Sequence, residues 1–338
     1  MSIGGRARLG PAPELFGTIP ELALHTDVEP EIRGVNQLNM DLIHQVTEAY
    51  LQTAEGSEAG RLRFLEGLWE IQSRVEAVDR PYVAPEPDAA REAYVTGQPL
   101  FLVSPPEVPL GEYLEAVSQV ARHASEMTGL PAPQGSALAD ADFASAVDAE
   151  RLAAAVNSPD EFVTQVASQL GAQPEGPLTP AAVAFVLVSA LVPFLTTPSS
   201  AACRSLGAQD PTALTSGHCP ACGASATMGR VGESTKLKGA ERVLWCGLCH
   251  AEWNYERIRC VRCGTRNPDN LRYTHVEGDS AHRVHLCDEC HGYTRFVFVD
   301  DLDKPVSMVV EDAVTATLDA VASNGGYTAT GDGGKARN

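Results

Sequence analysis

Four Cys-x-x-Cys pairs that recur with a fixed period constrain this chain more than any other feature. The pairs are Cys219/Cys222, Cys246/Cys249, Cys260/Cys263 and Cys287/Cys290. The third pair follows the first by 41 residues (219 to 260), and the fourth follows the second by the same interval (246 to 287). Each pair presents two sulfurs on one side of a tight turn, so two facing turns make a tetrahedral site for zinc or iron. We therefore expect two metal-binding modules, one built from the first four cysteines and one from the last four.

Two other uses of paired cysteines fit the sequence less well. Disulfides belong mainly to oxidising compartments and small stapled domains, whereas this chain has 338 residues, and residues 1–39 contain neither an apolar secretory core nor a twin-arginine signal. A thioredoxin-like motif would need a flanking βαβ pattern, which the sequence around the pairs lacks. The ninth cysteine, Cys203, stands apart, and we interpret it as a buried, inert thiol.

Residues next to the pairs repeat as well. Gly223 and Gly264 each follow the second cysteine of a module's first pair, where glycine allows a turn with positive φ. His250 and His291 follow the second pair of each module. Because four sulfurs already complete each site, we expect these histidines beside the metals rather than bound to them.

Runs rich in aromatic and β-branched residues separate the cysteine pairs. They predict strands at 243–245, 271–276 and 293–299. Each module is therefore predicted to be a small three-stranded, rubredoxin-like (zinc-ribbon-like) fold. A module of about 40 residues buries too little core to be stable alone, so its metal contributes much of the folding energy.

The part before the cysteine pairs differs in composition. Residues 1–218 hold 11 Lys+Arg and 28 Asp+Glu, against 14 and 16 in residues 219–338. This shift, with turn-rich stretches at 196–200 and 207–211, predicts a linker and a domain boundary. The predicted division is an irregular segment at 1–35, a helical domain at 36–205, metal modules at 206–258 and 259–304, a helix at 305–324 and a disordered tail at 325–338.

Apolar residues at helical spacing predict helices near 64–78 and 110–127. A capping box at Ser158 is expected to open a helix that ends near Leu170. A fourth helix, from Thr179 to about Leu195, is almost wholly apolar but short and contains Pro193. We therefore expect it at the centre of a bundle, not in a membrane.

The fold class that follows is α+β multidomain: an N-terminal all-α domain, two tandem metal modules and a C-terminal helix from about 306 to 322. The helical part contains no Gly-x-Gly-x-x-Gly, P-loop or Gly-x-Ser-x-Gly motif. His44 and His123 lie within helical patterns, where a structural role is commoner than a catalytic one. We predict no catalytic residues and no enzyme activity.

The motifs around the cysteines resemble the formate dehydrogenase accessory protein family, FdhE. The resemblance lies in Cys219-Pro-Ala-Cys-Gly223, Trp245-Cys-Gly-Leu-Cys249, Glu252-Trp253, Arg257 and Cys260-Val-Arg-Cys263. The family pattern continues with a last Cys-x-x-Cys, a strand and an acidic, apolar helix, which correspond to Cys287/Cys290, 294–299 and 306–319. The resemblance is specific over about 219–322.

The resemblance implies a cytoplasmic maturation factor that is required for formate dehydrogenase activity. Its expected partner is the dehydrogenase catalytic subunit, which carries molybdenum or tungsten and an iron–sulfur cluster. The eight paired cysteines are expected to hold two metal ions, iron or zinc, with four cysteines each. Trp253 and Arg257 match the motif between the modules and are candidate partner contacts, with a packing role for Trp253 and a structural salt bridge for Arg257 as the alternatives.

Two other function classes remain open. Iron in a four-sulfur site can cycle between oxidation states, which would make the chain a rubredoxin-like electron-transfer protein. Tandem ribbons also bind nucleic acid, and residues 219–299 carry 11 Lys+Arg against 9 Asp+Glu. However, eight thiolates with two divalent ions add a charge of about −4 there, and the whole chain stands at −19. We therefore expect neither a nucleic-acid partner nor membrane insertion.

Overall fold

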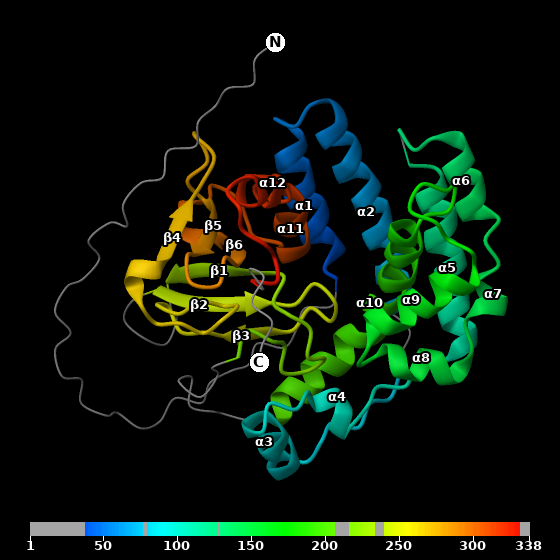
Figure 1. The fold of residues 1–338 in the computed structure, drawn as a ribbon, viewed down its shortest axis with the longest axis horizontal. Helices are drawn as coiled ribbons and strands as arrows, with labels where there is room; N and C mark the ends of the chain where they lie inside the picture. Colours follow the sequence, from blue (N-terminus) through cyan, green and yellow to red (C-terminus); the bar gives the residue numbers. More distant parts are fainter. Residues whose placement is uncertain (1–37, 77–79, 128, 207–215, 234–239, 332–338) are drawn as a thin grey trace.

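The computed structural model describes residues 38–331, apart from 77–79, 128, 207–215 and 234–239. Within these residues a helical region precedes a sheet that carries the cysteine pairs, and two further helices follow, which confirms the predicted α+β order. Figure 1 shows the sheet on one side of the molecule, a group of helices on the other, and the long helix α10 (Pro180–Ser205) running between them. The predictions for 1–35 and 207–211, and the last seven residues of the predicted tail, lie outside the described residues.

Helices make up most of the chain before the first cysteine pair. Twelve α-helices are present within the described residues: α1 (Met40–Leu51), α2 (Gly56–Glu76), α3 (Pro87–Val95), α4 (Leu100–Val103), α5 (Leu110–Ser125), α6 (Ala132–Ala139), α7 (Phe143–Ala146), α8 (Ala149–Ala155), α9 (Pro159–Gln169), α10 (Pro180–Ser205), α11 (Met308–Val314) and α12 (Thr317–Asn324). The helices predicted near 64–78 and 110–127 are present as α2 and α5. The helix predicted after Ser158 is α9, but the Ser158 side chain makes no capping hydrogen bond, so the predicted capping box is wrong.

Helix α10 is the core of the helical region and packs against α2, α5 and α9. It is long and apolar enough to cross a membrane by length and composition alone, yet Leu187, Leu191 and Leu195 are almost completely buried among other helices. The sequence predicted this central position. It also predicted a linker at 196–200, which is wrong, because these residues belong to α10. Two of their hydroxyls bond to the helix backbone: Thr196 Oγ1 donates to Val192 O at 2.9 Å, and Ser199 Oγ donates to Thr196 O at 2.8 Å.

Pro193 lies inside α10 without ending it. A proline has no N–H to donate to the carbonyl four residues earlier, which here is Ser189 O. That carbonyl instead accepts a hydrogen bond from Gln72 Nε2 of α2 at 2.9 Å. Both Gln72 and Ser189 are buried, so the bond satisfies a carbonyl that water does not reach.

The six strands form one sheet in the order β3–β2–β1–β6–β5–β4. They are β1 (Met228–Glu233), β2 (Ala240–Trp245), β3 (Glu252–Asn254), β4 (Leu271–Thr274), β5 (His282–Cys287) and β6 (Tyr293–Phe298). Each module contributes three antiparallel strands, as predicted. The modules are nevertheless joined into one continuous sheet, because β1 of the first pairs in parallel with β6 of the second, with Met228 opposite Arg295.

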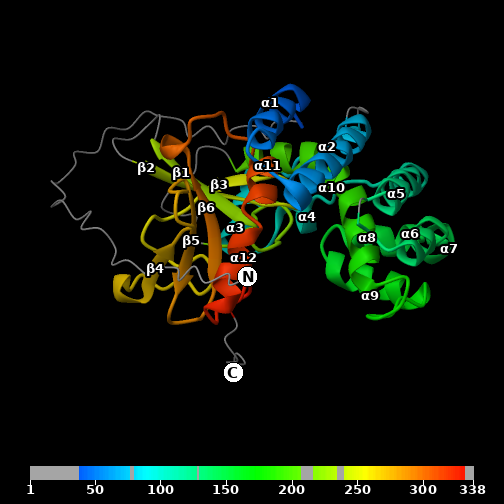
Figure 2. The ribbon, with the colours of Figure 1, turned by 90° about the horizontal axis from the view of Figure 1, so that it is seen from above.

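The two faces of the sheet pack against different partners, since side chains alternate along each strand. On β6, Tyr293 contacts Leu318 of α12, and Val297 packs beside Met308 of α11. Phe296 points the other way, into the core that also contains the first four cysteines and α10. Figure 2 shows α11 and α12, in red, alongside the sheet, and α11 also packs with α1 and α2.

The C-terminal helix predicted at 306–322 is in fact two helices, α11 and α12, separated near Thr315. The buried Thr315 hydroxyl accepts a hydrogen bond from Arg295 Nη1 of β6 at 3.0 Å. Arg295 also pairs with Asp312 Oδ1 at 2.5 Å and Asp319 Oδ1 at 3.1 Å. The chain bends at Thr315 because one buried arginine holds both helices against the sheet.

The predicted disordered tail is ordered as far as Gly331. Thr328 N donates to His291 O at 2.8 Å, and Thr328 O accepts from Tyr293 N at 3.0 Å. Tyr327 Oη donates to Asp288 Oδ1 at 2.6 Å. Residues 325–331 therefore lie against the second module, and the prediction of disorder is wrong for them.

Candidate metal centres

All four Cys-x-x-Cys turns share one backbone conformation. In each, the N–H of the first cysteine donates to the carbonyl five residues later, at 2.7–3.0 Å. The residue after the second cysteine has positive φ in every turn: 80° at Gly223, 57° at His250, 77° at Gly264 and 54° at His291. The predicted role of the two glycines is confirmed, and the two histidines adopt the same left-handed conformation, which usually favours glycine.

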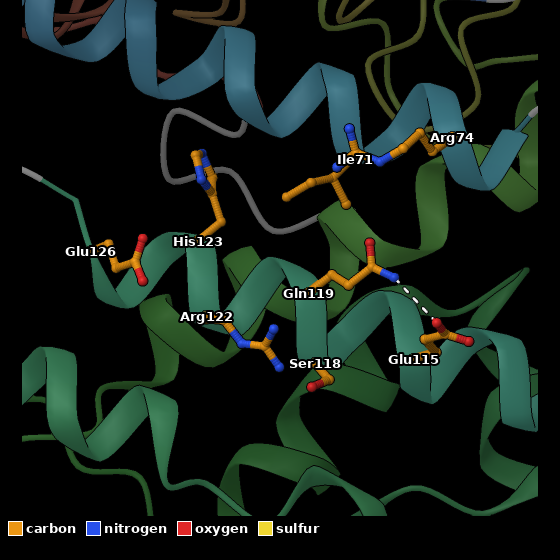
Figure 3. Close-up of a pocket in the computed structure, with 8 residues that line it drawn as sticks. All are labelled: Ile71, Arg74, Glu115, Ser118, Gln119, Arg122, His123 and Glu126. Atoms are coloured by element: carbon orange, nitrogen blue, oxygen red, sulfur yellow. Dashed lines mark hydrogen bonds between the residues drawn. The ribbon is translucent and has the colours of Figure 1, made fainter.

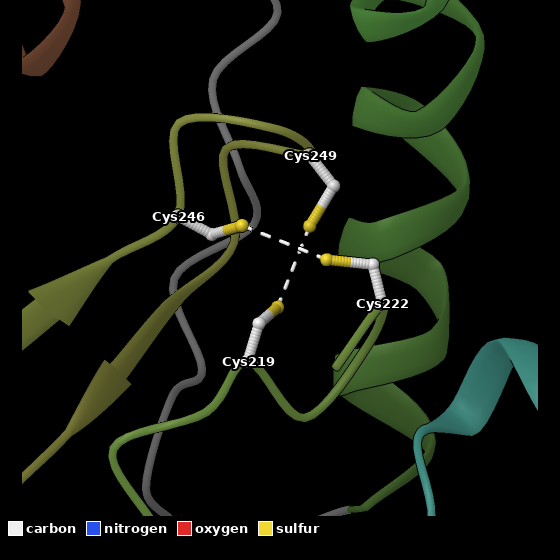
Figure 4. A group of neighbouring side chains, drawn as sticks. All are labelled: Cys219, Cys222, Cys246 and Cys249. Carbon is white, nitrogen blue, oxygen red and sulfur yellow. Dashed lines mark hydrogen bonds between the residues drawn. The ribbon is translucent and has the colours of Figure 1, made fainter. Parts of the chain in front are cut away.

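The first cluster consists of Cys219, Cys222, Cys246 and Cys249, whose sulfurs all lie within 4.8 Å of one another. Cys219 Sγ is 3.5 Å from Cys249 Sγ, and Cys222 Sγ is 3.6 Å from Cys246 Sγ. Figure 4 shows these two separations crossing at the centre of the cluster, as opposite edges of a tetrahedron do.

The second cluster, Cys260, Cys263, Cys287 and Cys290, repeats this arrangement. Cys260 Sγ lies 3.8 Å from Cys290 Sγ, and Cys263 Sγ lies 3.8 Å from Cys287 Sγ. The cysteines thus form two separate groups in sequence order. The alternative, in which Cys246 and Cys260 share one site, does not occur.

The geometry of both clusters fits a metal ion. Metal–sulfur bonds of about 2.3 Å imply tetrahedron edges of about 3.8 Å, close to the observed sulfur–sulfur distances. A disulfide is much shorter, at about 2.05 Å, and all eight cysteines are free thiols. Removing four thiolates from water is costly, so four buried thiolates require a cation among them. Each cluster can hold one ion, and its four-sulfur donor set suits zinc and iron alike.

The two clusters differ in exposure to solvent. Every cysteine of the first cluster is buried, with at most 4% exposed. In the second cluster Cys260 and Cys287 are buried, Cys290 is half-buried and Cys263 is exposed. The sequence carried no sign of this difference, because it depends on which distant segments cover each turn.

The histidines that follow the cysteine pairs lie in different surroundings. His250 is buried and stacks on Trp245, with 5.3 Å between ring centroids. Burial lowers the pKa of His250 to about 4, although the nearby Cys246 acts against this. His291 is exposed and lies 5.9 Å from the Tyr327 ring. Neither histidine belongs to the two groups of potential ligands.

Trp253 and Arg257, the predicted partner contacts, are placed differently. The Trp253 side chain is only 5% exposed and belongs to the main core, and its Nε1 donates to Ser216 O at 3.1 Å. Its position therefore fits the packing alternative. Arg257 is exposed, and no side-chain ion pair joins it to another described residue.

Arg242 is a structural residue to which sequence reasoning gave no role. Its guanidinium lies 4.2 Å from the Phe296 ring centroid, and its Nη1 donates to the carbonyls of Glu256, Arg257 and Arg259 at 2.8–3.2 Å. Burial lowers the pKa of Arg242 to about 10. Arg242 thus holds the segment between the two clusters in place. Arg283 stands 41 residues later, at the interval of the cysteine repeat, and this recurrence is the feature of the sequence that could have indicated a structural role for Arg242.

A buried polar cluster links α1 to the second module. It consists of Tyr50, Asp279, His282 and Glu311, and we call it the Tyr50 cluster. Tyr50 Oη donates to Glu311 Oε2 at 2.8 Å, while the His282 ring nitrogens lie 2.8 Å from Glu311 Oε2 and 2.7 Å from Asp279 Oδ2. Burial alone would lower the pKa of His282, but the hydrogen bonds and charges of Asp279 and Glu311 outweigh it and raise that pKa to about 9.

An open groove of about 480 Å³ lies between α2 and α5 in the helical region (Figure 3). Its lining includes Arg74, Glu115, Arg122 and His123. His123 Nε2 is engaged at 2.7 Å with the carbonyl of Phe64, and its ring stacks on the Phe64 ring with 4.6 Å between centroids. This histidine therefore has the structural role expected from the sequence.

Comparison with known proteins shows which proteins this chain is similar to. A family model described as "FdhE, central domain" matches residues 218–257. A protein named FdhE homolog from Shewanella baltica (strain OS223) is 31% identical over 112 residues, which are 33% of this chain and 36% of that protein. This alignment thus spans about a third of the relative's length.

Longer similarities extend into the helical region. The FdhE homolog of Pseudomonas aeruginosa is 27% identical over 308 residues, covering 87% of this chain and 89% of that protein. The crystal structure of the FdhE protein from Pseudomonas aeruginosa shares the fold, with a TM-score of 0.56 and 23% identity over 87% of this chain and 94% of that one. With two four-cysteine clusters on one sheet, the chain is similar to FdhE proteins in sequence and shares their fold along most of its length.

Proposed function

We propose that this chain is an accessory protein required for formate dehydrogenase activity. The observation that carries the proposal is the pair of four-cysteine clusters, held on one sheet in a chain that is similar to an FdhE homolog over 87% of its length. The eight cysteines bind two metal ions, iron or zinc. The protein acts on another protein and is not itself an enzyme.

The proposed partner is the catalytic subunit of formate dehydrogenase, and the two proteins are proposed to interact in the cytoplasm. Eight free thiols suit a reducing compartment, where thiolates stay available for metal. The exposed Arg257, on the segment between the two clusters, is the proposed contact residue. Trp253 is buried in the main core, so its side chain is proposed to act in packing and not as a direct contact.

Complementation tests the proposed function. In a strain that lacks the gene, the wild-type chain should restore formate oxidation, whereas a chain with Cys222→Ser and Cys263→Ser should not, at unchanged levels of dehydrogenase polypeptide. Cys203→Ala is the matched control, because it removes a buried thiol that belongs to neither cluster. If gene deletion left formate oxidation intact and altered transcription or translation, a nucleic-acid-binding function would replace the proposal.

Co-purification tests the partner and the role of Arg257. Tagged wild-type protein should retain the dehydrogenase catalytic subunit, and Arg257→Ala should retain less of it at unchanged metal content. A surface substitution of this kind alters stability by no more than about 0.5 kcal/mol. Equal retention by both proteins would remove Arg257 from the contact surface.

Electron transfer is the second candidate function. It is favoured by the exposure of Cys263, because an iron site that transfers electrons needs one ligand near the surface. Anaerobically purified protein that is red and reversibly reducible would support this candidate. Colourless, zinc-loaded protein that still restores formate oxidation would exclude it.

A further inference from the structure

The two clusters have the same arrangement of sulfur atoms, but different segments of the chain cover them. The 41-residue repeat makes Cys263 the counterpart of Cys222, and Cys290 the counterpart of Cys249. Cys222 and Cys249 are 4% and 0% exposed, whereas Cys263 is exposed and Cys290 half-buried. Donor atoms and sulfur–sulfur distances are nearly the same in both clusters, so access to the ion is what distinguishes them.

The helical region seals the first cluster. Two backbone N–H groups of α4, those of Leu100 and Phe101, donate to Pro220 O and Ala221 O, between the first two cysteines, both at 2.9 Å. Phe101 is completely buried. In Figure 4 a green helix, the colour of α10, runs directly beside Cys249 and Cys222. Both α4 and α10 therefore pack against the first cluster, whose cysteines are at most 4% exposed.

A second contact seals the other side of the first cluster. Ser199 Oγ of α10 donates to Cys249 O at 2.7 Å and also bonds to its own helix. At Gly223 the neighbouring segment approaches so closely that an added Cβ would lie 2.6 Å from Pro99 Cγ. At the matching residue of the second module, Gly264, the atoms nearest to an added Cβ belong to the Arg259 side chain, at 3.2 Å or more.

The second cluster is covered on one side and open on the other. The C-terminal segment passes over Cys290, since a Cβ added to Gly331 would lie 3.2 Å from Cys290 Sγ. Nothing comparable covers Cys263 among the described residues. Arg259 precedes its turn and Arg262 lies within it, so two guanidinium groups carry positive charge close to the second cluster.

We propose that the second cluster is a ligand-exchange site at which a small thiolate from solution reaches the metal on the side of Cys263, while the first metal is sealed in the core. In the exchange, the bond from the metal to Cys263 Sγ breaks as a bond to the incoming sulfur forms. The displaced Cys263 thiolate enters water, and no oxidation state changes. The inference rests on metal binding by the cysteines, and is independent of the identity of the dehydrogenase partner.

Metal release from the zinc-loaded full chain tests the proposal. With 4-(2-pyridylazo)resorcinol as the metal indicator, one zinc should leave quickly and the other at least about ten times more slowly, a difference of about 1.4 kcal/mol in barrier. Added N-acetylcysteine should accelerate only the fast phase, in proportion to its concentration. Two zinc ions that leave at one rate would overturn the proposal, whereas a chain that binds no zinc would overturn the metal binding itself.

Matched variants assign the two phases. Cys222→Ser should keep the fast phase and lose the slow one, and Cys263→Ser should do the reverse. Ser199→Ala, which removes a contact on the first cluster, should accelerate the slow phase alone. Iodoacetamide labelling of the wild-type chain is independent of any variant's folding: Cys263 should be alkylated first and the four cysteines of the first cluster last. The opposite order, or a fast phase that survives only in Cys263→Ser, would overturn the proposal.

Discussion

The residue after each cysteine pair illustrates how backbone conformation limits the choice of side chain. Glycine at 223 and 264 could be predicted to have positive φ because the Cys-x-x-Cys-Gly pattern is a tight turn. His250 and His291 take the same conformation, which no local rule predicted. At His250 the stacking on Trp245 offers a physical reason for keeping a histidine.

Replacing Gly264 tests this strain directly. Gly264→Ala should destabilise the metal-loaded protein by about 1–2 kcal/mol, because an L side chain at φ 77° crowds its own carbonyl. Gly111→Ala is the control, since Gly111 lies in α5 with open space around it and with no positive φ. Urea unfolding gives the free energy of unfolding of both variants and of the wild type. Equal stability of Gly264→Ala and wild type would contradict the strain expected at this position.

Among the elements, helices with a clear apolar period were predictable, and those shaped by distant contacts were not. α2 and α5 follow from apolar spacing alone. β1 was missed because Gly229 and Gly232 weaken its strand signal, yet a Cβ at Gly229 would lie 2.4 Å from the Phe296 ring. The glycine is required by the close approach of β6, a strand more than 60 residues away in sequence. The extension of α10 past Pro193 likewise depends on Gln72 of another helix.

The hydrogen bond from Gln72 to Ser189 O gives a prediction about α10. Gln72→Leu should cost about 1–3 kcal/mol, because it leaves a buried carbonyl without a donor. Pro193→Ala supplies an N–H to the same carbonyl, so the double variant should recover part of the loss. Unfolding free energies of the wild type and the three variants measure the coupling, and strictly additive effects would show that the two residues do not share this carbonyl.

The Tyr50 cluster predicts a pH dependence of stability. The pKa of His282 is raised to about 9 in the folded chain, against about 6.5 when unfolded. Its contribution is therefore complete below about pH 6.5 and is lost as pH rises through about 9. The groups facing it are Tyr50, Asp279 and Glu311, and Lys304 Nζ lies 4.1 Å from the Tyr50 ring centroid.

Asp279 acts in the opposite pH range. Burial would raise its pKa, but the hydrogen bonds from His282 lower it overall, so its contribution is lost as pH falls through its depressed pKa. His282→Gln should therefore be less stable than wild type at pH 6, and the gap should narrow towards pH 10. Urea unfolding of both proteins at pH 6 and pH 10 measures this difference in the free energy of unfolding. A difference that does not change with pH would refute the charged role of His282.

At the scale of the whole molecule, the sequence predicted two modules but not how they join. The 41-residue repeat identifies equal units, whereas the parallel pairing of β1 with β6 depends on contacts between them. The repeat also does not reveal that the first cluster shares a core with α10, while the second lies near α12 and the C-terminal segment. The sequence predicted a domain boundary between the helical domain and the metal modules, whereas the shared core couples the helical region to the first cluster.

Loss of one metal should therefore affect the helices unequally. Cys222→Ser should lower the thermal stability of the helical region, followed by circular dichroism at 222 nm, because it opens the core shared with α10. Cys263→Ser should leave that transition nearly unchanged. If the two substitutions lowered the thermal stability of the helical region equally, the shared core could not be what couples the first cluster to the helices.

Metal content tests the central claim, two separate four-cysteine metal sites, most directly. Anaerobically purified wild-type chain should contain two metal ions, and Cys222→Ser and Cys263→Ser one each, because each substitution removes a ligand from one cluster only. A wild-type chain with a single ion, or a single substitution that removes both ions or neither, would contradict the account.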